Sequence, residues 1–193
     1  MKGMNETIIE DKTFKGTDYS KAGLALGDYE HCSFINCDFS NSNLSKISFT
    51  GCKFEQCNLT MAILRDTSMK TVSFINCKLL GLHFKDCNTF LLSLNFDGCL
   101  LNLTSFYKLR LKKTAFKNCS IQESDFTESD LMGSLFDNCD LSGAIFQNTL
   151  LERADFRTAW NYSIDPELNR VKKAKFSING LAGLLGKYDL EIY

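Results

Sequence analysis

The chain has 193 residues, of which 44% are hydrophobic and 23% are charged, and its formal net charge is −1. This charge balance excludes the basic surface with which a protein binds nucleic acid directly. With one proline and a repeat that runs along the chain, no linker divides it, so we expect a single domain.

The N-terminal residues 1–12 lack the apolar core of a secretion signal. No segment of the chain approaches the run of about 20 apolar residues that a membrane-spanning helix needs. Nine cysteines fit a reducing compartment, where thiols stay free. We therefore expect a soluble, cytoplasmic protein with no membrane contact.

A phenylalanine column begins at Phe14 and repeats every 20 residues, with a single step of 22 between Phe74 and Phe96. Between these phenylalanines an apolar residue, here called a centre, occupies every fifth position, from Ile9 to Phe84 and from Leu91 to Phe156. A period of five fits neither an α-helix nor a flat strand, but it fits a square coil with four sides. The sequence therefore predicts a repeat solenoid of stacked coils.

The position two residues before each centre should also face inward, because side chains alternate across extended backbone. It should be small, since four sides converge on a narrow axis. Asn, Asp, Gly, Ser and Lys fill the corners, as turns require, and the preference of parallel crossovers predicts a right-handed coil. The small inward residues are Ala22, Ser42, Ala62, Thr104, Thr114, Ser124, Ser129, Ser134, Ala144, Thr149 and Ala154.

Eight of the nine cysteines occupy the same small inward position, and Cys87 follows Phe84 as Cys37 follows Phe34, which favours a role as buried apolar fillers. Stacked neighbours about 4.8 Å apart are wider than the ~3.8 Å between Cβ atoms that a disulfide prefers. The chain has no Cys/His spacing typical of zinc ligands, so we expect no metal site. These cysteines are Cys32, Cys37, Cys52, Cys57, Cys77, Cys87, Cys99, Cys119 and Cys139.

The step from Phe84 to the next expected centre, Leu91, is seven residues long. It marks a register break at 85–91 within the repeat region 1–158, with the two extra residues in Lys85–Phe90. One interpretation is a bulged corner between two stacked half-rods. The other is a bump that recognises a partner.

The C-terminal segment 159–193 should belong to the same domain. Val171 and Phe176 return to register and predict one more partial coil. A short helix that stops near Gly186 should present an apolar stripe, and the alternation in 189–193 fits a final strand. A solenoid needs its end capped, and we also expect this tail to form a homodimer. The interface residues would be Leu181, Leu184, Leu185, Tyr188 and Ile192.

The sequence contains no arrangement typical of catalysis. The two histidines, His31 and His83, each lie one residue from an inward position and should face solvent. No phosphate-binding loop or paired-carboxylate motif stands out. We therefore expect no catalytic, cofactor-binding or metal site, and a protein that is not an enzyme.

The motif, a small residue followed two positions later by Leu or Phe, is clear in Ser129–Gly133 and Ala154–Thr158. In this motif the chain resembles the pentapeptide-repeat family over about residues 7 to 158. The resemblance implies an all-β fold, a right-handed quadrilateral β-helix. In the quinolone-resistance (Qnr-like) members, a negative rod that mimics DNA occupies the DNA-binding saddle of gyrase or topoisomerase IV, and a C-terminal helix forms the dimer.

Residues 121–156 contain eight acids and one base, a net charge of −7, and supply the acids for such a role. The partner-binding residues would be Glu123, Asp125, Asp130 and Asp140. Opposite charges 20 residues apart offer an alternative, because they would pair locally and leave a protein-interaction scaffold of unknown partner with no topoisomerase role. The expected pairs are Lys108–Glu128, Arg110–Asp130, Lys117–Asp137, Glu152–Lys172 and Asp155–Lys175.

Overall fold

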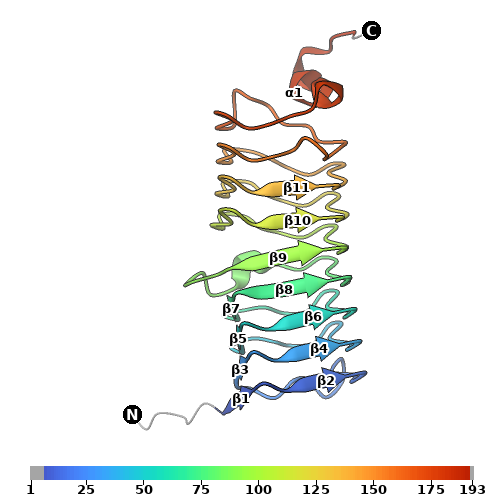
Figure 1. Cartoon of the computed structure of the whole chain (residues 1–193), viewed down its shortest axis with the longest axis vertical. Coiled ribbons are helices and arrows are strands. Elements are labelled where there is room, and N and C mark those ends of the chain that lie inside the picture. Colours follow the sequence, from blue (N-terminus) through green and yellow to red (C-terminus); the bar gives the residue numbers. More distant parts are fainter. Residues whose placement is uncertain (1–6, 192–193) are drawn as a thin grey trace.

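The computed structural model describes residues 7–191 as one straight stack of coils, with helix α1 at the C-terminal end (Figure 1). The chain rises from the N-terminus while the front strands run from left to right, so the coil is right-handed. This arrangement confirms the expected solenoid. The strands are β1 (Ile8–Glu10), β2 (Thr13–Lys15), β3 (Asp28–Glu30), β4 (Ser33–Ile35), β5 (Ser48–Thr50), β6 (Lys53–Glu55), β7 (Ser68–Lys70), β8 (Val72–Ile75), β9 (Leu94–Asp97), β10 (Ala115–Lys117) and β11 (Leu135–Asp137); α1 is Ala182–Leu185, and 3-10 turns lie at Phe84–Asp86, Ile178–Gly180 and Gly186–Tyr188.

Each coil has four sides, which we number faces 1 to 4 in chain order, beginning with the sides centred on Ile9, Phe14, Tyr19 and Leu24. Face 1 begins as a four-stranded parallel sheet, β1-β3-β5-β7, and face 2 is a seven-stranded parallel sheet, β11-β10-β9-β8-β6-β4-β2. Single parallel bridges join the coils on the other two faces. The 20-residue register places each side chain beside its counterpart in the next coil, as Phe34 lies beside Phe54.

The corners require a backbone conformation that most residues avoid. The second residue after a centre turns the chain with positive φ, for example 51° at Asn36, 56° at Asn41 and 63° at Gly51. Gly, Asn and Asp adopt this left-handed region at the lowest cost. The polar, glycine-rich corner composition of the sequence therefore has a conformational cause in addition to solvent exposure.

The phenylalanine column of face 2 is the spine of the core. Phe34, Phe54 and Phe116 have no exposed surface, and neighbouring rings stack with centroids between 4.6 Å (Phe136–Phe156) and 5.5 Å (Phe74–Phe96). A second phenylalanine column on face 4 meets it edge-to-face, as in the 5.9 Å contact of Phe106 with Phe116. Such aromatic pairs contribute about 0.5–1.5 kcal/mol beyond the area they bury.

The small inward positions are buried as expected in the regular coils. All nine cysteines are free and buried, and buried hydroxyls find backbone acceptors: Ser134 donates to the Leu111 carbonyl at 2.7 Å, and Thr149 to the Phe126 carbonyl at 2.9 Å. The expectation for Ala22 was wrong, because this residue is exposed. In this first coil the corner after Tyr19 comes two residues late, at Gly23 with φ 70°, whose N–H donates to the Tyr19 carbonyl.

The register break lies later in the chain than the sequence suggested. The 20-residue pairing continues through Asn88, which bridges Ser68, and it resumes at Leu94, which pairs with Val72 after a step of 22. The expectation that Leu91 is a centre was wrong. It is a corner residue with φ 57° and is 63% exposed. The extra residues form an outward bulge between Asn88 and Leu94, visible where the chain enters β9 (Figure 1).

The C-terminal end closes the rod. Phe176 stacks on Phe156 at 5.4 Å, which confirms the additional partial coil, and Leu184 packs against the core. Helix α1 ends at Leu185 with Gly186 as its C-cap, as expected, and a 3-10 turn follows to Tyr188. No strand forms in the described part of 189–193, and Ile192 lies outside the described residues. Within residues 7–191, no helix has the length and apolarity to cross a membrane.

Candidate partner-binding surface

The four acids expected to bind a partner do not share one surface. Asp125 precedes a centre of face 4, Asp130 a centre of face 1 and Asp140 a centre of face 3, while Glu123 forms the corner between faces 3 and 4. Glu123 is exposed, and the three aspartates are half-buried. The four carboxylates therefore point in different directions around the rod axis and form no continuous stripe along it.

Three of these acids also have a structural task. Asp125 accepts the backbone N–H of Thr127 at 2.9 Å, and Asp130 accepts that of Met132 at 3.2 Å. Asp140 accepts the N–H of Ser142 at 3.1 Å in the same way. An Asp or Asn that caps the backbone two residues later is an Asx turn, which helps each side of the coil to bend. Sequence reasoning missed this role, although the recurrence of Asp and Asn immediately before centres was a visible signal.

Uncharged hydrogen-bond donors stabilise the negative charge of the Asp140 carboxylate. Burial opposes its ionisation, but hydrogen bonds from Gln122 at 2.7 Å, from the Ser142 hydroxyl at 2.7 Å and from Asn161 at 3.0 Å outweigh that effect and lower the pKa of Asp140. Its charge is thus retained in the fold at neutral pH but is partly covered by neighbouring side chains.

The predicted ladder of ion pairs forms only in part. Lys108 pairs with Glu128 at 3.4 Å and Lys175 with Asp155 at 3.6 Å, as expected. The other three expected pairs do not form within residues 7–191. Backbone register does not fix which long side chains meet: Asp130 pairs diagonally with Lys112 at 3.2 Å, and Asp137 accepts a hydrogen bond from Thr158. The unformed pairs are Arg110–Asp130, Lys117–Asp137 and Glu152–Lys172.

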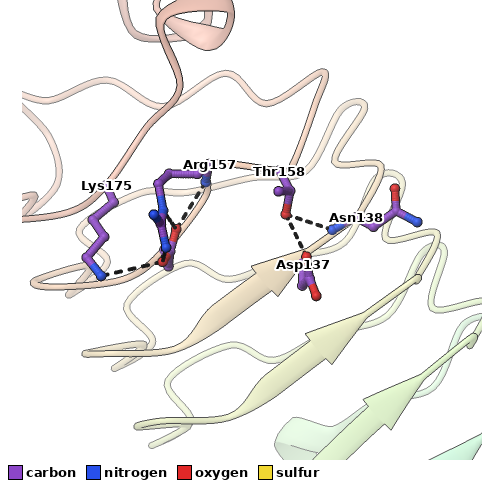
Figure 2. A network of polar contacts seen from close by, with 6 residues as sticks. Asp137, Asn138, Arg157, Thr158 and Lys175 are labelled. Carbon is purple, nitrogen blue, oxygen red and sulfur yellow. Dashed lines mark hydrogen bonds and ion pairs between the residues drawn. The ribbon is translucent and has the colours of Figure 1, made fainter.

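Face 2 near the C-terminal end shows how closely acid and base are interleaved. The Asp155 carboxylate accepts two-pronged hydrogen bonds from Arg157, with the shortest contact at 2.8 Å, and Lys175 approaches it from the next coil (Figure 2). Beside this cluster, Thr158 links Asp137 and Asn138 across neighbouring coils (Figure 2). This part of the acidic segment therefore presents paired charges to solvent.

The same network predicts how stability depends on pH. Hydrogen bonding from Arg157 lowers the pKa of Asp155 below its ordinary 3.8, although burial opposes the shift. A carboxyl whose pKa is lower in the folded state than in the unfolded state stabilises the fold at every pH above its unfolded-state pKa. That stabilisation is lost as the pH falls through the folded-state pKa. We expect urea unfolding at pH 7, 4 and 3 to show a smaller acid-induced loss for Asp155→Asn than for the parent. Equal losses would contradict the assignment.

The bulge between Asn88 and Leu94 is the most conspicuous departure from the regular rod. Phe90 is 68% exposed and Leu91 63% exposed, while Leu92 turns back against the core. The turn itself is ordinary, because the Phe90 N–H donates to the Asn88 side chain at 2.9 Å. A regular corner is therefore displaced outward and presents two large apolar side chains to solvent, which is a feature of interaction surfaces.

Cations surround the bulge on face 1. Lys70 lies 5.9 Å from the Phe90 ring centroid on one side. On the other, Lys108 and Arg110 line a cavity of about 260 Å³ together with Thr89 and Leu92. Lys108 is engaged by Glu128, but Arg110 has no ion-pair partner among residues 7–191. Apolar tips with a free guanidinium nearby suit a partner that supplies apolar and acidic groups.

The C-terminal tail offers a second candidate interface. Leu181 is 46% and Tyr188 49% exposed, whereas Leu184 and Leu185 are half-buried. Tyr188 is held in place, since its hydroxyl donates to Glu167 at 2.9 Å and Lys187 lies over its ring. The predicted stripe is thus divided between residues that cap the core and residues that face solvent.

Within the described residues, no group of three or more His, Cys, Asp and Glu side chains is placed to hold a metal ion. His83 lies 3.9 Å from Asp86 at the surface, and His31 lies against Gly51 of the next coil.

A family model described as a pentapeptide repeat region matches residues 28–95 and 91–160, which is most of the chain. The chain belongs to the pentapeptide-repeat family. No curated protein matches it in sequence. Among solved structures it is similar to full-length QnrB1, a plasmid-mediated fluoroquinolone resistance protein, with 17% identity, a TM-score of 0.53, and coverage of 95% of this chain and 100% of that one. It also matches HetL, a pentapeptide-repeat protein of Nostoc sp. strain PCC 7120 involved in heterocyst differentiation regulation, with 16% identity, a TM-score of 0.33, and coverage of 90% and 87%.

At 17% identity the likeness to QnrB1 supports the pentapeptide-repeat fold and leaves the function to be argued from this chain's own surface. The fold gives every member a similar rod, so the features that distinguish this one are side chains that the repeat does not dictate. They are the apolar bulge with its cations, the dispersed turn aspartates and the partly exposed tail.

Proposed function

We propose that this pentapeptide-repeat protein is a non-enzymatic binding rod that docks a protein partner at the bulge of face 1. The observation that carries the proposal is the exposure of Phe90 and Leu91 next to Arg110, which has no ion-pair partner among residues 7–191. Large apolar side chains next to an arginine are the residue types that dominate binding energy at interfaces. The regular coils on either side hold the bulge in a fixed position, which lowers the entropic cost of docking.

For the partner we propose DNA gyrase or topoisomerase IV, with protection from quinolones or a related toxin as the consequence. The likeness to QnrB1 supports this proposal through the shared fold, and the acidic segment 121–156 supports it through its charge. The free thiols suit the cytoplasm, where we place the protein. A scaffold for a different partner is the second candidate, favoured by the dispersal of the acids over three faces and by their local partners.

The decisive experiment is DNA supercoiling by purified gyrase in the presence of a fluoroquinolone, titrated with this protein, together with direct binding to immobilised gyrase. Restored supercoiling and saturable binding are expected. Neither rescue nor binding at any concentration would reject topoisomerase as the partner and leave the scaffold proposal. Capture of a partner from lysate, compared between the parent and the bulge variants described next, would then test the bulge alone.

We expect the double change Phe90→Ser, Leu91→Asn to weaken partner binding by about 30-fold or more, the effect of losing an interface hot spot. The fold should be unharmed, because Asn suits the left-handed corner that Leu91 occupies. Leu103→Asn is the matched control, since Leu103 is also a corner residue, with φ 61° and 59% exposure. Equal binding by the double variant and the control would contradict docking at the bulge.

Deleting Thr89 and Phe90 tests the same surface in a different way. The deletion restores the 20-residue step and moves Leu91 to the centre between Met69 and Leu111, so a regular rod should form without loss of thermal stability. Binding should be lost while the melting temperature is retained. A deletion variant that is stable and still binds would exclude the bulge.

The acidic surface is tested separately with Asp125→Asn, Asp130→Asn and Asp140→Asn combined. An Asn oxygen accepts the same backbone N–H, so the Asx turns are kept while three charges are removed. Loss of gyrase rescue in this variant alone would assign binding to DNA-like charge. Loss in the bulge variant alone would assign it to the apolar bulge.

We further propose that the C-terminal tail joins two rods into a homodimer. Leu181 and Tyr188 supply exposed apolar surface for it, and Leu184 anchors the tail to the core. Light scattering coupled to size exclusion should give the dimer mass for the parent and the monomer mass for Leu181→Asp. Ile178→Asp, a change at an exposed residue outside the predicted interface, should remain dimeric. A monomeric parent would refute the proposal.

A further inference from the structure

A cavity of about 320 Å³ lies where the last coil meets the C-terminal cap. One wall is formed by Trp160, Asn161 and Tyr162, at the end of face 3, and the other by the turn and helix that carry Asn179 and Ala182. Ligand pockets span roughly 300–1,000 Å³, so this volume suits a ligand of one ring. The cavity is distinct from the bulge, which lies on an earlier coil, and of the four acids considered above only Asp140 contacts its wall, through Asn161.

Tyr162 is the central residue of this junction. Its ring contacts Phe156 and Phe176 with centroid distances of 5.9 and 5.5 Å, and it is only 4% exposed. The cap can close around Tyr162 because residues 180 and 183 are glycines. Any side chain at Gly180 or Gly183 would collide with Tyr162. The junction is therefore closely packed around the Tyr162 ring.

The hydroxyl of Tyr162 is buried and has no hydrogen-bond partner among residues 7–191. It lies against Gly180, which lines the cavity. Buried hydroxyls are nearly always paired, because an unpaired one loses its hydration without compensation. A group inside the cavity that bonds to this hydroxyl would remove that cost, so the orphaned atom points to a ligand.

The chemistry of the walls defines the class of ligand. No lining residue is charged, and burial raises the pKa of Tyr162, so its phenol stays neutral. The side chain of Asn179 has no hydrogen bond within the described residues and is available to a ligand. Trp160, 43% exposed, supplies a flat apolar face. An aromatic face together with amide and hydroxyl groups suits a neutral ring that carries hydroxyls.

We propose that this cavity binds a neutral monosaccharide or cyclic polyol unit, stacked on Trp160 and hydrogen-bonded to the Tyr162 hydroxyl and the Asn179 amide. The site is independent of the partner proposed for the bulge, because it requires neither gyrase nor Phe90. Its location between coil and cap means that occupancy would also strengthen the attachment of the cap.

Trp160 is the single tryptophan of the chain, so its fluorescence reports directly on the site. The protein is titrated with D-glucose, N-acetyl-D-glucosamine and myo-inositol up to about 50 mM, which covers millimolar dissociation constants, with glucose 6-phosphate as the charged comparison. A saturable change with at least one neutral compound, a matching rise in melting temperature and weaker binding of the phosphate are expected. No saturable change with any neutral compound, or tighter binding of the phosphate, would overturn the proposal.

Three variants locate the binding. Tyr162→Phe should melt at the same or a higher temperature than the parent, because it removes an unpaired hydroxyl, and should bind about 3–10-fold more weakly. Asn179→Ala should weaken binding to a similar extent. Ala182→Leu places a larger side chain at the exposed mouth of the cavity and should abolish binding while the cap stays folded. Parent-like binding by Ala182→Leu, or by both Tyr162→Phe and Asn179→Ala, would refute the site.

Discussion

Replacing Phe116 with alanine is expected to lower the free energy of unfolding by about 3–5 kcal/mol. Phe116 is completely buried and stacks on Phe96 at 5.1 Å and on Phe136 at 4.8 Å. It also meets Phe106 and Phe126 edge-to-face. The strands above and below are fixed by their 20-residue register, so the structure has little freedom to close the cavity that the truncation would leave.

Guanidinium unfolding monitored by circular dichroism measures this loss. Phe14→Ala is the matched control, because Phe14 is half-buried at the end of the column and stacks only on Phe34. Its loss should be clearly smaller than that of Phe116→Ala. Since coils contact only their neighbours, a broader transition for Phe116→Ala would indicate that the rod has been divided into two less coupled parts. A parent-like midpoint for Phe116→Ala would contradict the stacked column.

The period of the sequence was sufficient to predict the coil, its inward side chains and its free cysteines. Five-residue sides leave one large and one small inward position, and burial of centres such as Phe34 and of fillers such as Cys57 follows directly. The additional coil that ends at Phe176 was predictable because it keeps the same register. These features depend on the backbone path, which the repeat determines almost completely.

The features of the candidate site were less predictable, because the repeat does not control outward side chains. Leu91 is apolar and in register, as a centre should be. Two extra residues before Leu94 nevertheless allow the chain to place Leu91 in a corner, and Leu92 covers the core instead. Asp130 has Arg110 beside it in register, yet it pairs with Lys112. Long flexible side chains choose among several neighbours of similar energy, and sequence spacing does not rank them.

The cysteines provide a second large and measurable consequence of the fold. Burial raises the pKa of Cys87 to about 12 and that of Cys52 to about 11. At pH 8 a thiol with a pKa of 12 is ionised at a fraction of about 10⁻⁴, against about 10⁻¹ for one with a pKa of 9, and only the thiolate reacts. In addition, the thiols of the main column point at backbone carbonyls, as Cys57 does at Phe34 and Cys139 at Phe116.

We therefore expect the native protein at pH 8 to show almost no reaction with an aromatic disulfide reagent, and all nine thiols to react once the chain is unfolded in guanidinium. Leu103→Cys supplies an exposed corner thiol as the control, and it alone should react rapidly in the folded protein. Rapid reaction of any native cysteine in the parent would contradict the filler role. If labelling proceeds through opening of the rod, Phe116→Ala should speed it by about 10²–10⁴, the factor that corresponds to a loss of about 3–5 kcal/mol. The same experiment thus connects the reactivity of the thiols to the stacking of the phenylalanines around which they pack.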